Sequence, residues 1–140
     1  MEANAILLPI FVMGLLHVVM FVWMLVTRLP AMTKAGLSPQ DARDTSALKS
    51  LPPEVAQVAD NYNHLFEQPV LFYAVAISIA VLGHVDALHV ACAWVFTGLR
   101  IAHSLVQATI NVVNIRFTLF LLAWIALAVM IVREALALLS

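Results

Sequence analysis

The chain has 140 residues, of which 64% are hydrophobic and only 11% are charged, and its mean hydropathy is +1.00. This composition excludes an ordinary soluble domain and indicates an integral membrane protein. A net charge of −1 gives no reason to expect a nucleic-acid partner. The single cysteine, Cys92, excludes a disulfide framework.

Long apolar runs dominate the sequence. A bilayer core about 30 Å thick is crossed by a helix of about 20 mostly apolar residues. Four runs are long enough, at about residues 5–26, 58–83, 87–109 and 117–139. The first lacks the basic start and small-residue cleavage pattern of a signal peptide, so we expect it to be retained. The sequence therefore predicts one all-α domain over residues 1–140, a membrane-spanning four-helix bundle.

The basic residues predict the orientation of the bundle. Loop 28–56 carries Arg28, Lys34, Arg43 and Lys49, and Arg116 lies in the connection between the last two spans. Basic residues near helix ends remain on the cytoplasmic side. We therefore expect this loop inside and both termini outside, in the cell inner membrane if the source is a bacterium.

Few polar residues lie within the spans, and they recur at helical spacing. Asn63 and Glu67 are four residues apart in the second span, while Arg100, His103 and Gln107 follow an i, i+3, i+7 pattern in the third. Each set is expected on one helical face. Ionisable groups at membrane depth are costly, so they usually face the bundle interior and have a partner.

Depth predicts how these two sets meet. A rise of 1.5 Å per residue places Glu67 about 13 Å and Arg100 about 15 Å from the inner end of the spans, so an ion pair is expected. Pro69 cannot donate to the Leu65 carbonyl and should kink the second span. With Arg116 at its mouth, the expected result is a cationic pocket for a ligand that carries carboxylates.

Structural interpretations remain open for the same residues. Glu67 and Arg100 could form a buried pair that only fixes helix register. His103 could be a buried histidine bonded to the backbone, and Arg116 could only set the topology. Outside this set, His84, Asp86 and His89 have the side chains of metal ligands, but no fourth ligand accompanies them, so no metal site is expected.

Two motifs resemble a known family. "NHLFEQPVLFY" in the second span and "GLRIAHSLVQATINVVNIRF" from the third span onward are similar to the MAPEG superfamily of membrane-associated proteins in eicosanoid and glutathione metabolism, especially its uncharacterised bacterial members. The resemblance implies a homotrimer with glutathione bound between subunits. By that resemblance Arg116 is the catalytic residue that stabilises the thiolate. The glutathione-binding residues it implies are Asn63, Glu67, Arg100 and His103, and we expect Gln107 to join them because it shares the helical face of Arg100 and His103.

The chain departs from the family pattern at three places. Characterised members carry an arginine about one turn before the second-span Asn, where this chain has Ala59 and Asp60. In the eicosanoid branch Glu follows Asn by three residues rather than four, and Gln107 stands where a tyrosine is expected.

Two functions from different classes are compatible with these features. We expect a glutathione-dependent transferase or peroxidase-like enzyme that acts on lipophilic electrophiles reaching it through the bilayer. The alternative is a non-enzymatic membrane scaffold or ligand carrier that retains the fold. A transporter or proton relay is disfavoured because the polar residues do not continue into the outer half of the spans.

Overall fold

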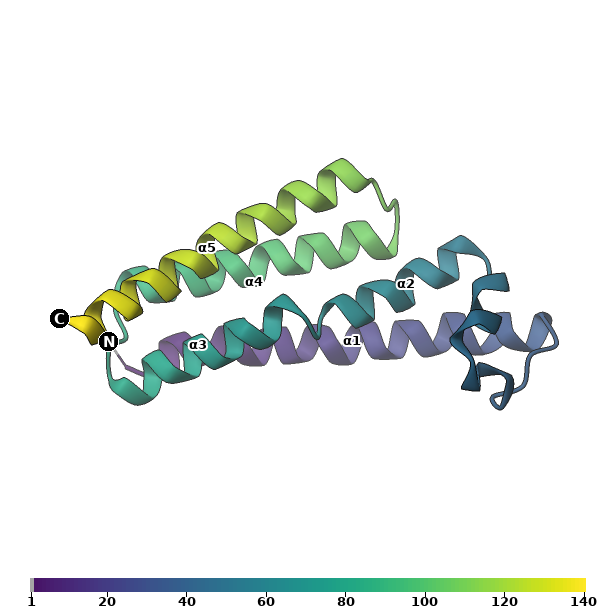
Figure 1. Ribbon diagram of the computed structural model, residues 1–140, viewed down its shortest axis with the longest axis horizontal. Helices are drawn as coiled ribbons and strands as arrows, with labels where there is room; N and C mark the ends of the chain where they lie inside the picture. Colours follow the sequence, from purple (N-terminus) through teal and green to yellow (C-terminus); the bar gives the residue numbers. More distant parts are fainter. Residues whose placement is uncertain (1) are drawn as a thin grey trace.

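The computed structural model describes residues 2–140 and contains five α-helices. They are α1 (Asn4–Lys34), α2 (Pro53–His64), α3 (Gln68–Leu82), α4 (Ala87–Ala108) and α5 (Val113–Leu139), with short 3₁₀ helices η1 (Asp41–Arg43) and η2 (Thr45–Ser50) in the loop after α1. Figure 1 shows α4 and α5 as a hairpin beside α1, α2 and α3. Both termini lie at the end of the bundle that holds the α3–α4 turn, here called the turn end, and the α1–α2 loop lies at the opposite loop end.

Four candidate membrane spans confirm the predicted all-α membrane bundle: Asn4–Lys34, Pro53–Leu82, Ala87–Ala108 and Val113–Leu139. The third agrees with the predicted run to within one residue. The first continues well past residue 26, because Pro30 is accommodated within the helix. The fourth begins at Val113, before Arg116, so that this arginine lies in the first turn of α5 rather than in a connection.

The second span is broken rather than kinked. Helix α2 ends at His64, α3 begins at Gln68, and Glu67 has the non-helical angles φ −98° and ψ −101°. Pro69 is the second residue of α3, where its missing N–H is tolerated. The predicted bend is therefore a three-residue turn, and residues on either side of it no longer share a helical face.

The core is a narrow seam between the helices. Met13, Met20, Phe72 and Phe96 are fully buried, and the last two rings stack with centroids 4.4 Å apart. Most other large apolar side chains on the spans are exposed, with α5 the least buried. Such a surface is stable against lipid tails or neighbouring subunits, which agrees with a membrane protein.

The turn end is held by polar contacts. Gly83 ends α3 in the left-handed conformation, with φ 75°. Asp86 then caps α4 by accepting from the His89 N–H at 2.8 Å. The Arg133 guanidinium donates to both carboxylate oxygens of Asp86, which ties the start of α4 to the end of α5.

Candidate functional site

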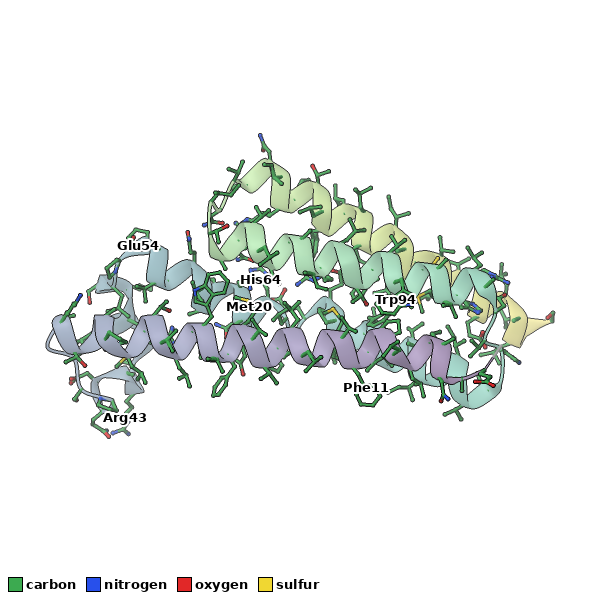
Figure 2. The ribbon with its side chains drawn as sticks, turned by 180° about the vertical axis from the view of Figure 1, so that it is seen from behind. Phe11, Met20, Arg43, Glu54, His64 and Trp94 are labelled. Carbon is green, nitrogen blue, oxygen red and sulfur yellow. The ribbon has the colours of Figure 1, made fainter. Side chains whose placement is uncertain are left out.

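A cavity of about 220 Å³ lies where the broken second span faces the α4–α5 hairpin. Its lining comes from three parts of the chain: His64, Glu67, His103, Gln107, Val113, Arg116, Phe117 and Phe120. Figure 2 shows His64 between α2 and the hairpin, well away from Arg43 in the loop. The structure thus brings together Glu67, His103, Gln107 and Arg116, which the sequence pattern places in one pocket.

Arg116 reaches the cavity from the first turn of α5. The preceding connection includes Asn111, which has the left-handed angle φ 48°, a conformation that asparagine tolerates better than most residues. The Asn111 side-chain oxygen accepts a hydrogen bond from Arg116 Nη1 at 2.9 Å. The connection therefore holds the guanidinium in a defined place beside the cavity.

Helix α4 presents His103 and Gln107 four residues apart on one face. Both are buried, with 5% and 1% of their surface exposed, and they line the cavity. His103 Nδ1 and Gln107 Oε1 have no hydrogen-bond partner among residues 2–140. Buried polar atoms are normally paired, so a ligand in the cavity would satisfy both.

Glu67 does not form the expected direct ion pair with Arg100 within the protomer. Its side chain is 65% exposed, and its carboxylate lies 3.5 Å from His64 Nδ1. The reason is the broken helix, because the turn carries Glu67 off the helical face on which the prediction depended. The carboxylate is exposed and lines the cavity, where a ligand cation could reach it.

Arg100 is outside the cavity lining and contacts the helix break. It is 1% exposed, and its Nη2 donates to the His64 carbonyl at 3.4 Å. Its Nη1 lies 3.4 Å from Gln68 Oε1. If the oxygen and nitrogen of the Gln68 amide are exchanged, the oxygen instead accepts from Trp124 Nε1 at 3.2 Å. The hydrogen bond from Arg100 to the His64 carbonyl does not depend on the orientation of the Gln68 amide.

Asn63 faces away from this cavity. It is exposed and lines a different hollow, together with Arg28, Lys49 and Asp60. His64, the next residue, lies in the pocket position expected for Asn63. The centroid of its ring is 6.5 Å from that of the His103 ring. The sequence contained a signal for this replacement of Asn63 by His64. His64 precedes Glu67 by three residues, which is the spacing between Asn and Glu in the eicosanoid branch.

Asn61 is a buried polar residue that the sequence pattern did not single out. It is 0% exposed, and neither its amide oxygen nor its amide nitrogen has a hydrogen-bond partner in the described chain. The signal was its position, since Val58, Asn61 and Leu65 follow the helical period of the buried face of α2.

The histidines at the turn end have partners within the protein. His84 Nδ1 lies 2.6 Å from Glu134 Oε1, and His89 Nδ1 lies 3.0 Å from the His84 carbonyl. Among residues 2–140, no group of three His, Cys, Asp or Glu side chains is arranged to hold a metal ion.

Comparison with known protein families matches residues 6–136 to the MAPEG family. The chain belongs to the MAPEG family. Its members are typically glutathione-dependent transferases or peroxidases. No curated protein and no solved structure matches this MAPEG chain.

The donor and acceptor groups around the cavity suit glutathione. The tripeptide carries two carboxylates, an ammonium group, two amides and a thiol. Arg116 offers a cation for a carboxylate or the thiolate, and Glu67 offers an anion for the ammonium group. The unpartnered atoms of His103 and Gln107 complement amide groups. The residues present therefore fit this group.

Proposed function

We propose that this MAPEG protein is a membrane-embedded, glutathione-dependent transferase that acts on lipophilic electrophiles. The observation that carries the proposal is the composition of the cavity. Arg116 stands beside the imidazole of His103 and the amide of Gln107, next to an aromatic wall of Phe117 and Phe120. Such a site offers polar anchors for a peptide and an apolar side for a second substrate that arrives from lipid.

Arg116 is the proposed catalytic residue. A nearby cation lowers the pKa of a thiol, and the thiolate is the nucleophile. In conjugation to an aryl halide, the sulfur forms a bond to the ring carbon, the carbon–halogen bond breaks, and halide leaves with the electron pair. The thiol proton passes to solvent. A peroxidase-like reaction would convert a lipid hydroperoxide and two glutathione molecules into an alcohol, water and glutathione disulfide.

A homotrimer is part of this proposal. The cavity of about 220 Å³ within one protomer is smaller than the roughly 300–1,000 Å³ that ligand sites occupy. A neighbouring subunit placed against the exposed apolar faces would enlarge and close it. We place the loop end, with its basic residues, on the cytoplasmic side and both termini outside, in the inner membrane if the source is a bacterium.

A titration with glutathione tests the proposed function. Purified protein in lipid nanodiscs should gain thermal stability at millimolar glutathione and should conjugate it to chlorodinitrobenzene. S-methylglutathione, whose sulfur cannot form the thiolate, should stabilise the protein without conjugation. If glutathione neither stabilises the protein nor reacts, the proposal is wrong.

A second candidate is a non-enzymatic scaffold or ligand carrier. It is favoured by the missing arginine, because Ala59 is buried and Asp60 lines the hollow on the other side of α2, so neither supplies a cation to the cavity. On this view Glu67→Gln, at a 65% exposed side chain, should leave a folded trimer with normal function. On the enzymatic view the same variant should weaken glutathione binding and slow conjugation.

A further inference from the structure

The break between α2 and α3 leaves a backbone carbonyl without its helical donor. Pro69 has no N–H, so the Leu65 carbonyl, four residues earlier, cannot form the usual helix hydrogen bond. No other backbone N–H within residues 2–140 donates to it. Leu65 is fully buried, and in a membrane an unsatisfied carbonyl is costly. Some other group must satisfy it.

His17 of α1 supplies the missing donor. Its Nε2 lies 2.9 Å from the Leu65 oxygen. The ring packs edge to face against Phe66, with centroids 5.1 Å apart. A histidine on an otherwise apolar face of α1 therefore contacts the one carbonyl that Pro69 leaves without a donor. His17 and Leu65 are 48 positions apart in the chain.

The other ring nitrogen of His17 has two neighbours, one an acceptor and one a possible donor. His17 Nδ1 lies 2.8 Å from the Met13 carbonyl and 3.3 Å from the Tyr73 hydroxyl. The Met13 carbonyl already accepts the His17 backbone N–H within α1. The Leu65 carbonyl therefore needs the imidazole proton more, which favours the tautomer with hydrogen on Nε2. In this tautomer Nδ1 accepts from the Tyr73 hydroxyl, and the cost is that the Nδ1 lone pair faces the Met13 oxygen.

A second side chain, from α4, donates to the carbonyl that precedes that of Leu65. The His64 carbonyl accepts from Arg100 Nη2 of α4, as well as from the Glu67 N–H at 3.3 Å. Two side chains from different helices thus fix consecutive carbonyls. The residues on either side of Leu65, His64 and Glu67, are those that the turn presents to the cavity.

We propose that His17 is a positioning residue: by holding the Leu65 carbonyl it fixes the turn that presents His64 and Glu67 to the ligand cavity. The role of the turn in ligand binding rests on the proposed glutathione site. The hydrogen bond from His17 to Leu65 and its effect on the turn are independent of that site, and both can be measured without any ligand.

Hydrogen–deuterium exchange of the ligand-free protein in nanodiscs provides that measurement. His17→Phe keeps a ring but removes the donor, so the amides of Leu65, Phe66 and Glu67 should exchange on the order of tenfold faster, as expected for one lost buried hydrogen bond. His17→Gln, which retains an N–H donor, should restore part of the protection. Tyr73→Phe removes the hydroxyl that donates to Nδ1 and so favours the tautomer that cannot donate to Leu65; it should also speed exchange, but less than His17→Phe.

Pro69→Ala supplies the decisive comparison, because it restores an N–H for the Leu65 carbonyl. In that background His17→Phe should leave exchange of the turn unchanged. Equal acceleration with and without Pro69 would overturn the proposal, since the imidazole would then act by packing alone. If His17→Phe by itself does not fold, a folded Pro69→Ala/His17→Phe protein supports the proposal, and an unfolded one contradicts it.

Glutathione binding tests the consequence separately. His17→Phe should weaken binding by about tenfold or less while the pKa of bound thiol stays unchanged, because Arg116 on α5 is untouched. A wild-type protein that does not bind glutathione would refute the proposed function and leave the exchange result standing. Binding that His17→Phe leaves unchanged would overturn the positioning role.

Discussion

Arg100 Nη2 lies 3.4 Å from the carbonyl oxygen of His64, so the most deeply buried cation of the bundle is bonded to the backbone at a helix break. This relationship changes the expected role of Arg100. A guanidinium that donates to this carbonyl can hold the turn from the α4 side, and a contact with ligand is not needed to explain its burial.

Replacing Arg100 with lysine should therefore damage the protein despite the retained charge. An ammonium group lacks the planar guanidinium that donates to the His64 carbonyl, and the loss should destabilise the fold by about 1–3 kcal/mol. Thermal unfolding in nanodiscs measures this. The matched control is Arg133→Lys, at a partly exposed ion pair, where the change should be about 1 kcal/mol or less. Equal effects at the two sites would contradict the assignment.

Arg116→Ala should impair chemistry more than binding. Without the guanidinium, the pKa of bound thiol should rise, and conjugation should slow about 100-fold, the usual effect of removing one charge-stabilising donor. Ultraviolet absorbance of the thiolate and turnover with chlorodinitrobenzene measure the two effects. Arg43→Ala is the control, because Arg43 is an exposed cation in the loop. A loss of binding with normal thiol acidity would show that Arg116 only anchors a carboxylate.

Asn111 permits a test of how Arg116 is oriented. Asn111→Gly removes the side-chain acceptor, which lies 2.9 Å from Arg116 Nη1, but tolerates the φ of 48°. We expect nearly unchanged stability and slower conjugation. Asn111→Ala also removes the acceptor and adds backbone strain of about 1–2 kcal/mol, so it should lower the melting temperature as well. Equal melting temperatures for the two variants would contradict the left-handed conformation.

The four spans were predictable because an apolar run of sufficient length is a strong signal in itself. The helix break was not. Proline is often accommodated by a kink, as Pro30 is within α1. Whether a span bends or breaks depends on donors for the carbonyl that proline leaves unpaired. At Pro69 that donor is His17 on α1, and Arg100 on α4 donates to the adjacent His64 carbonyl.

The same break divides the site predictions. His103 and Gln107 lie on α4, which is continuous, and their i, i+4 spacing places both at the cavity. Asn63 and Glu67 have the same spacing, but Asn63 lies on α2 and Glu67 lies in the turn. They do not share a helical face, and Asn63 lines the hollow on the other side of α2. Helical periodicity is informative only as far as the helix extends, and for that reason His64 was missed.

Gln107→Leu should stabilise the ligand-free protein while weakening glutathione binding. The Gln107 side-chain oxygen is buried without a partner in the described chain, so its removal should relieve a desolvation cost of about 1 kcal/mol or more. The control is Ser104→Ala, whose hydroxyl is also buried without a partner among residues 2–140 but lies outside the cavity lining. Ser104→Ala should raise the melting temperature without changing binding. A lower melting temperature for Gln107→Leu would mean that its oxygen is already satisfied.

Acid should weaken the turn end through Asp86. The pKa of Asp86 is lowered to about 2 by the His89 backbone N–H and then by Arg133, whereas an unfolded Asp has a pKa of roughly 3.9. A lowered folded pKa gives stability that is complete above pH ~4 and is lost as the pH falls toward ~2. Asp86→Asn keeps a good N-cap but removes the charge, so the melting temperature should depend less on pH in this window. Asp60→Asn is the control, and an identical acid response in Asp86→Asn and wild type would contradict the assignment.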